Sequence, residues 1–420
     1  MTRRSLYANI AWLIADRGAR LLIAFGVNAW IARVLGPEQY GALSYAQAAV
    51  SVIGFLNLAA IEAILVRMLV DHPEERGQIL GSALLLRGGG GLLTLLVVSI
   101  AMRLVAAPHD AAVIAPLIAA TTILQAFDVV EYWLRLQLKS RYGVIARITG
   151  LLLGGAARLA ALLAPDPLVA LAAAMVFEAA LVAAGMYLAS RYTGLHLRIG
   201  RIDVPRCRRI LREAGPMIAA AAAVSIYVRF GYLILGNSHG TQDVGLLSVA
   251  NVVAEALHAP ATAVAASYGP ILLALRDDPA EFGQQLRRLM RLASLASLTL
   301  AAGATLLGPI LIPLIFGARY AASGPLIAIL AWTVPFVYLS VVSELWFVGH
   351  GLQRYILPKT VMAAVLYVAL NLIVAPHYGA TGVAGVTVLT YSISAFWSNL
   401  ALRATRPLFI QQLRAFALSS

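Results

Sequence analysis

Apolar runs of roughly 20 residues recur along the whole chain, and this feature most constrains how the chain can fold. One such run crosses about 30 Å of hydrocarbon as a single α-helix. Hydrophobic residues make up 61% of the chain and charged residues only 12%, a balance unlike that of soluble proteins. We therefore predict an all-α polytopic membrane protein with about twelve transmembrane helices. The spans are expected near residues 6–35, 42–70, 79–106, 112–138, 144–164, 168–190, 216–236, 246–275, 283–307, 322–347, 355–374 and 380–402.

Arginine and lysine gather in alternate loops between these spans. One set of loops holds most of them, with the densest cluster between Arg191 and Arg212, whereas the other set is nearly free of them. The positive-inside rule places the basic loops and both termini in the cytoplasm. This topology accounts for the net charge of +13, so that nucleic acid is not an expected partner.

The longest connection divides the chain into two halves of similar size. We predict an N-terminal six-helix lobe at 1–190, a basic cytoplasmic linker at 191–215 that carries a short amphipathic helix, and a C-terminal six-helix lobe at 216–420. The segment GALSYAQ at 41–47 is echoed by GLLSVAN at 245–251, and a Leu-Gly pair precedes each copy, at Leu35-Gly36 and Leu235-Gly236. Such halves are typical of parallel repeats related by an axis along the membrane normal, with a central cavity between the two lobes.

Ionisable side chains lie within these spans, where each costs at least about 2.5–3.5 kcal/mol unless it faces a partner or a watery cavity. We therefore expect a polar path through the membrane. The cationic residues assigned to a substrate-binding cavity are Arg17, Arg20, Arg87, Arg158 and Arg229. The residues assigned to ion coupling or charge pairing are Asp16, Asp128, Glu131, Arg135, Glu178, Glu255 and His258. In the fourth span, a stripe with steps of three and four residues joins Asp128 to Arg135.

Some of these charges have simpler explanations. Glu131 and Arg135 are equally well explained as an intrahelical pair, and Arg158 is as well explained without cargo. Arg147 lies near the cytoplasmic interface, where anchoring is the favoured role, and a lone histidine such as His258 is more often a hydrogen-bonding residue than a proton carrier. The glycines at 88–91 indicate close helix packing or a hinge.

Enzymatic and metal-binding patterns are missing from the sequence. The single cysteine, Cys207, excludes an intrachain disulfide and a CxxC metal site. No HExxH, Walker A or dinucleotide fingerprint occurs, so we expect no metal, no cofactor and no ATP site.

Five segments together resemble a known family: ARVLGPEQYG at 32–41, ILREAGP at 210–216, DVGLLSVA at 243–250, LIFGARY at 314–320 and PHYGATG at 376–382. The chain resembles Wzx-type polysaccharide flippases of the multidrug/oligosaccharidyl-lipid/polysaccharide (MOP) exporter superfamily. The resemblance implies an inner-membrane transporter whose two six-helix lobes are arranged in a V. It further implies that the protein moves undecaprenyl-diphosphate-linked oligosaccharide to the outer leaflet, for O-antigen, lipopolysaccharide or exopolysaccharide synthesis. It also implies contacts with membrane lipids, a polysaccharide polymerase and chain-length machinery. Family members often carry an acidic residue near position 230, where this chain has Arg229, so that their ion coupling does not carry over directly.

Two other functions stay open at this point. A drug/cation antiporter of the same superfamily is expected to have an aromatic, weakly charged pocket, whereas this chain is rich in intramembrane arginine. A polytopic glycosyltransferase or polymerase is expected to carry carboxylates on sizeable outer loops, whereas the outer loops predicted here are short. We expect alternating access between the two lobes, driven by an ion gradient or by the membrane potential.

Overall fold

The protein was analysed as a computed structural model that describes residues 3–58, 61–195, 203–275, 278–401 and 403–416, while the side chains of residues 1–24 lie outside the description. The described residues form helices and no β-strand, as predicted. The helices are α1 (Arg3–Ile53), α2 (Glu62–Asp71), α3 (Arg76–Leu104), α4 (His109–Leu124), α5 (Val129–Leu136), α6 (Ser140–Ala161), α7 (Pro167–Tyr192), α8 (Val204–His239), α9 (Thr241–Ala274), α10 (Pro279–Phe316), α11 (Ser323–Leu330), α12 (Thr333–Gly349), α13 (Ile356–Ser392), α14 (Ser398–Ala401) and α15 (Arg406–Phe416). Short 3₁₀ turns join some of them, including η1 (Gly54–Asn57), η3 (Pro73–Glu75) and η4 (Gln125–Asp128), and a π turn, η7 (Ile393–Trp397), joins α13 to α14.

Nine stretches of the described chain are long and apolar enough to cross a membrane. One of them, Gln353–Ala401, contains a break at Gly379 and therefore covers the eleventh and twelfth predicted spans. The first two predicted spans begin within α1, which breaks at Gly36. The predicted all-α polytopic fold is confirmed.

Two glycines with the same backbone conformation show how the two halves of the internal repeat align. Gly36 has φ 76° and ψ 173°, and Gly240, between α8 and α9, has φ 86° and ψ 178°. Both lie in a region that side chains strongly disfavour, so each lets the chain turn sharply between two spans. Gly240 follows Gly36 by 204 positions, which is also the spacing of the two echoed segments. The partner of Gly36 is thus Gly240, whereas Gly236, which the sequence suggested, lies inside α8 and is buried.

The chain divides into two compact units by its contacts. Unit 1 consists of Met1–Pro37 and Asp243–Ser420, and unit 2 consists of Glu38–Gln242. The two boundaries fall beside the paired glycines, so each unit holds five consecutive spans of one half and the first span of the other half. This grouping differs from the predicted lobes, 1–190 and 216–420, in the placement of the first and seventh spans. The predicted amphipathic helix of the linker is the beginning of α8, which continues into the seventh span.

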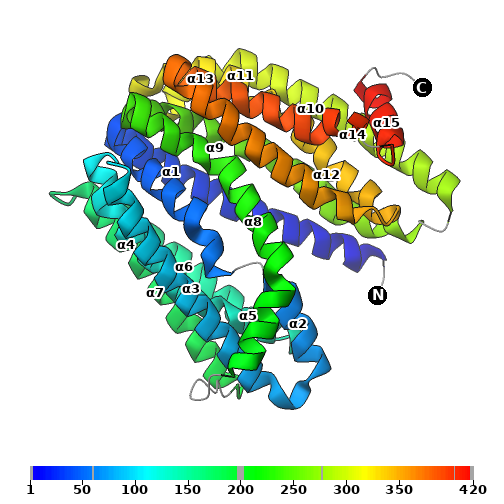
Figure 1. The fold of residues 1–420 in the computed structure, drawn as a ribbon, viewed down its shortest axis with the longest axis horizontal. Coiled ribbons are helices and arrows are strands. Elements are labelled where there is room, and N and C mark those ends of the chain that lie inside the picture. The colour runs from blue at the N-terminus through cyan, green and yellow to red at the C-terminus, as the bar shows by residue number, and fades with distance from the viewer. Residues whose placement is uncertain (1–2, 59–60, 196–202, 276–277, 402, 417–420) are drawn as a thin grey trace. The chain divides into compact units, whose positions relative to one another are not determined.

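Unit 2 packs its helices closely through small residues. The core joins α2, α3 and α5, with Leu65, Leu80 and Leu134 fully buried. The neighbouring helices α3, α4, α6 and α7 appear side by side in Figure 1. A Cβ on Gly91 of α3 would lie 2.7 Å from the backbone of Ile123, so this glycine permits α3 and α4 to approach. Close helix packing is therefore the role of Gly91 within the glycine run of α3.

In unit 1, α10, α12 and the C-terminal helix α15 share an apolar core that includes Leu286, Trp346 and Leu408. A buried polar chain fastens α15 to the same core. Gln412 donates to Ser343 Oγ at 2.8 Å and accepts from Asn399 Nδ2 at 3.0 Å. Gln412, Ser343 and Asn399 are all buried and hydrogen-bonded to one another through Gln412. These bonds fix the position of α15 against the membrane-spanning helices.

Candidate functional site

Six charged side chains from four helices and one turn of unit 2 form a continuous ionic network, which we call the ion-pair network. Its members are Glu62 of α2, Arg87 of α3, Asp128 of η4, Glu131 and Arg135 of α5, and Arg147 of α6. Four of them, Arg87, Asp128, Glu131 and Arg135, are predicted site residues. The structure thus brings together charges from the second, third, fourth and fifth predicted spans.

Local geometry around α5 positions the acidic members. The 3₁₀ turn η4 ends at Asp128, and Glu131 lies in the first turn of α5. Arg135 follows Glu131 by four residues, the spacing that places two side chains on the same helix face. The polar stripe predicted for the fourth span is therefore the surface of α5 that carries the network.

Arg87 is the most deeply buried member, with 3% of its side chain exposed. Its Nη2 lies 3.8 Å from Asp128 Oδ2, and its Nε donates to Asn57 Oδ1 at 3.3 Å. Asn57 in turn donates to the backbone oxygen of Thr122 at 3.0 Å. Nη1 of Arg87 is buried and has no hydrogen-bond partner within the described protein. Asp128 and Asn57 therefore hold Arg87 in place, and its Nη1 group is left to donate to another acceptor.

The other two arginines bridge several carboxylates. Arg135 donates to Glu131 Oε1 and to Glu62 Oε1, at 2.6 Å each. Arg147 pairs with Glu131 Oε2, and its Nη2 lies 3.4 Å from Asp128 Oδ1. Glu131 therefore binds two arginines, and its contact with Arg135 is the predicted intrahelical pair. That pair is part of the larger network, so the two readings of Glu131 are compatible.

The ion-pair network carries equal numbers of opposite charges: three arginines against three carboxylates. Burying an unpaired charge is expensive, whereas a hydrogen-bonded ion pair offsets much of the lost hydration. Balanced pairing therefore explains how six ionisable groups are kept among helices that are apolar enough to span a membrane. The network as described is a neutral cluster and not a net cationic surface.

A second ion pair joins α6 to α7. Arg158 Nη2 lies 2.7 Å from Glu178 Oε2, and both side chains are largely buried. Gly154 makes room for this pair, because a Cβ there would lie 2.5 Å from Glu178 Cβ. Nε of Arg158 is buried without a hydrogen-bond partner in the described part of the chain. The structure thus pairs Arg158 and Glu178, two residues that the sequence assigned to different roles.

The remaining predicted site residues are placed as follows. Arg229 of α8 is half-buried, and its guanidinium lies 5.7 Å from the ring centroid of Tyr232. His258 of α9 contacts Thr333 Oγ1 through Nε2 at 3.0 Å, which agrees with the hydrogen-bonding role. Glu255 of α9 is exposed. The side chains of Asp16, Arg17 and Arg20 lie outside the described residues, so their assignment to the site stays a prediction.

Sequence reasoning did not assign Glu62, Asn57 or Arg147 to the site. Arg147 was interpreted as an interfacial anchor, but the structure pairs it with two carboxylates of the ion-pair network. A usable signal was present, because the fourth predicted span carries two acidic groups close together, Asp128 and Glu131, and only one arginine, Arg135. The unpaired acid required a cation from another span, and Arg147 begins the next one.

Comparison with known proteins fixes the family. A family model described as polysaccharide biosynthesis protein matches residues 6–272, more than half of the chain. The chain belongs to this family. A search of curated proteins finds no match.

Solved structures similar to this chain include transporters of the MOP superfamily and a lipid II flippase. An inward-facing multidrug resistance transporter of the MATE family is 16% identical with a TM-score of 0.72, and the match covers 95% of each chain. The lipid II flippase MurJ, in an inward closed conformation, is 12% identical with a TM-score of 0.73, covering 97% of this chain and 91% of MurJ. A MOP superfamily transporter from Pyrococcus furiosus is 17% identical with a TM-score of 0.60, covering 96% and 93%. The family and the fold agree with the predicted resemblance: the chain belongs to a polysaccharide biosynthesis family and has the fold of these transporters.

Proposed function

We propose that this protein is a flippase that moves undecaprenyl-diphosphate-linked oligosaccharide from the inner to the outer leaflet of the cytoplasmic membrane. The polysaccharide biosynthesis family supplies the metabolic setting, and the fold similarity to a lipid II flippase supports a lipid-linked cargo. Transport proceeds by alternating access of the two lobes, with the polyprenyl chain left in the lipid.

The observation that carries the proposal is the ion-pair network of unit 2. A diphosphate cannot cross hydrocarbon without counter-charge, and arginine offers a planar fork of donors that matches phosphate oxygens. In the cargo-free protein, Asp128, Glu131 and Glu62 hold the arginines. The diphosphate would displace these carboxylates and take their place on the arginines, with the free Nη1 donor of Arg87 as one contact.

The same exchange offers a route for energy coupling. When the cargo releases Asp128 and Glu131, whose side chains are largely buried, each would become an unpaired negative charge in a poorly hydrated place. Protonation or a cation would neutralise that charge. Uptake of a proton or cation would accompany cargo binding and its loss would accompany release. An ion gradient or the membrane potential would then drive the cycle.

The test is translocation of purified undecaprenyl-diphosphate oligosaccharide in proteoliposomes, with and without an imposed ion gradient. Arg87→Gln and Arg135→Gln should each slow flipping at least about tenfold, the loss of one charge-assisted contact of about 1.4 kcal/mol. The matched control is Arg141→Gln. Arg141 lies in α6 as Arg147 does but contacts Tyr142 and no carboxylate in the described protein. Arg20→Ala and Arg229→Ala test the sequence-based assignments in the same vesicles.

The outcomes separate the candidate functions. Flipping at the parental rate in both network variants would refute this site, while flipping by none of the proteins would refute the function. Export of organic cations against protons by the same vesicles, without flipping, would favour a drug/cation antiporter. Elongation of the glycan by purified protein would favour a glycosyltransferase or polymerase.

A further inference from the structure

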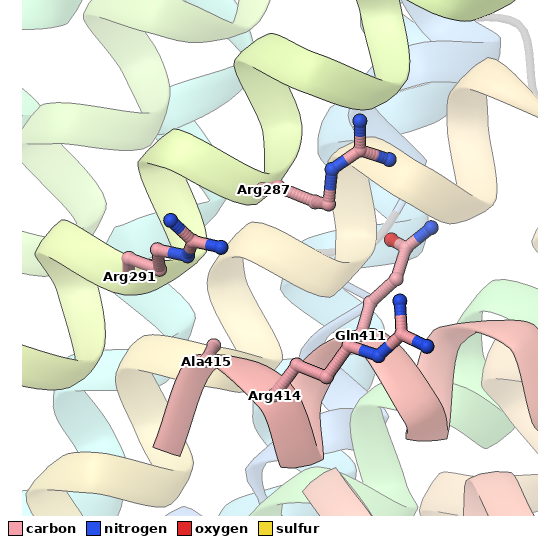
Figure 2. A pocket seen from close by; sticks show the side chains of 5 residues that line it. All are labelled: Arg287, Arg291, Gln411, Arg414 and Ala415. Carbon is pink, nitrogen blue, oxygen red and sulfur yellow. The ribbon is translucent and has the colours of Figure 1, made fainter. Parts of the chain in front are cut away.

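A second group of arginines lines a cavity in unit 1, where the C-terminal helix lies against α10. The cavity has a volume of about 370 Å³ and is lined by Arg287, Arg291, Gln411, Arg414 and Ala415. Figure 2 shows Arg287 and Arg291 extending from α10 and Gln411 and Arg414 from α15. No part of the proposed transport cycle uses these residues.

The walls of this cavity are held in place by the protein core. Leu408 and Ala415 of α15 are buried, and they belong to the apolar cluster that contains Leu286 and Leu289 of α10. The hydrogen bonds of Gln412 with Asn399 and Ser343 also hold α15 in place. Since both helices are fixed, the backbone positions that carry the arginines are set before a ligand arrives, which lowers the entropic cost of binding.

Electrostatics favour an anion in the cavity. Arg287 of α10 and Arg414 of α15 bring two positive charges to one cavity, where like charges repel each other. Arg291 of α10 also lines the cavity. Neither Arg287 nor Arg414 forms a salt bridge with a carboxylate among the described residues. A bound phosphate would relieve this repulsion and accept charge-assisted hydrogen bonds from the guanidinium groups.

Gln411 indicates that the ligand carries a hydrogen-bond donor beside its phosphate. Its Oε1 is buried and has no hydrogen-bond partner in the described protein, which leaves an acceptor unsatisfied in the wall of the cavity. A buried acceptor of this kind costs about 1–3 kcal/mol unless a donor reaches it. A hydroxyl group beside the phosphate would supply that donor.

We infer that the cavity binds a glycerophosphate group, with the phosphate on Arg287 and Arg414 and a glycerol hydroxyl on Gln411. Positive-inside topology predicts that this end of α10 and the segment after the last span face the cytoplasm. The same chemistry is present in the headgroup of phosphatidylglycerol and in soluble glycerol phosphate. The volume lies near the lower end of small-ligand sites, about 300–1,000 Å³, and suits a headgroup better than an oligosaccharide.

The test measures lipid binding to the purified full-length protein by native mass spectrometry. Phosphatidylglycerol, phosphatidic acid and phosphatidylcholine are titrated separately, and glycerol 3-phosphate is added as a soluble competitor. The pocket variant is Arg287→Gln/Arg414→Gln. Its matched control is Arg288→Gln/Arg403→Gln, which removes two exposed arginines that do not line the cavity. Gln411→Leu tests the hydroxyl contact.

Phosphatidylglycerol should bind the parent and the control at least about tenfold more tightly than the pocket variant, the effect of losing about 1.4 kcal/mol of contact. Gln411→Leu should weaken phosphatidylglycerol but leave phosphatidic acid, which lacks the glycerol hydroxyls, unchanged. Competition by glycerol 3-phosphate without lipid binding would make the soluble ester the ligand. Equal lipid binding by the pocket and control variants would overturn the inference.

A thermal measurement keeps the test decisive if the pocket variant folds poorly. Phosphatidylglycerol should raise the melting temperature of the unaltered protein in phosphatidylcholine nanodiscs, because a ligand that binds the folded state stabilises it. No rise at saturating phosphatidylglycerol would also overturn the inference.

Discussion

Replacing Asp128 with asparagine should destabilise the protein more than replacing Arg87 with glutamine, although the two residues form one ion pair. Arg87 is almost fully buried, whereas about a quarter of the Asp128 side chain is exposed. Asp128 has a second cation, Arg147, at 3.4 Å. Arg87 has a single carboxylate partner among the described residues, so removing that partner leaves a buried positive charge without compensation.

The magnitudes follow from these contacts. Removing one partner of a buried pair costs about 3–5 kcal/mol when the other charge is left uncompensated, which is the case for Asp128→Asn. The separation of 3.8 Å is a Coulombic contact and too long for a hydrogen bond, so the neutral asparagine oxygen does not replace it. In Arg87→Gln, Asp128 is still paired with Arg147. The main effect is the loss of the hydrogen bond from Arg87 to Asn57, which should lower the free energy of unfolding by about 1–3 kcal/mol.

The assay is thermal unfolding of the purified protein in nanodiscs, with the double variant included. Arg87→Gln/Asp128→Asn should melt at or above the temperature of Asp128→Asn. The double variant also removes the positive charge of Arg87, which Asp128→Asn leaves buried without a carboxylate partner. Glu74→Gln, at an exposed position of η3, is the control for loss of a carboxylate and should melt like the parent. If Asp128→Asn also melted like the parent, or if the double variant were the least stable of all, the proposed compensation would be refuted.

Three further predictions use matched positions in the fold. Gly91→Ala should cost about 1–3 kcal/mol by overpacking and lower the melting temperature, whereas Gly89→Ala, with no atom within 4 Å of the new Cβ, should not. Gly36→Ala and Gly240→Ala should each cost about 1–3 kcal/mol in the same assay, because both glycines combine a positive φ with an extended ψ, a conformation that is almost restricted to glycine. Gln412→Ala should free the C-terminal helix, which limited proteolysis would then remove first.

Much of the fold follows from the sequence because the bilayer permits few solutions. An apolar run of sufficient length becomes a helix, and the loops between runs are constrained by their charges. The echo at 204 residues also located the repeat, although a loose Leu-Gly match pointed to Gly236 instead of Gly240. A two-residue match in a chain rich in leucine and glycine contains too little information to fix the register. Backbone conformation fixes the register, since Gly240 shares the positive φ of Gly36, whereas Gly236 lies inside the helix α8.

The composition of the ion-pair network could be predicted only in part. Helical periodicity places Asp128, Glu131 and Arg135 on one face, because that depends on a single helix. The partners Arg87 and Arg147 come from α3 and α6, and periodicity does not say which helices are neighbours. Likewise, the repeat reveals two halves but not that the first span of each half is grouped with the other half.

The carboxylates paired with the arginines of these spans determine which anions the arginines can bind. A cavity lined with free arginines would attract any anion and would be costly to keep empty, whereas a network with three carboxylates is neutral until a competitor arrives. An anionic cargo then has to outcompete Glu62, Asp128 and Glu131 for the same donors, so its affinity is the difference between two sets of contacts. We expect a diphosphate to displace the carboxylates where a singly charged anion would not, because it carries enough charge and acceptors to replace more than one carboxylate. Selectivity for a diphosphate headgroup is therefore expected to arise from the carboxylates as much as from the arginines.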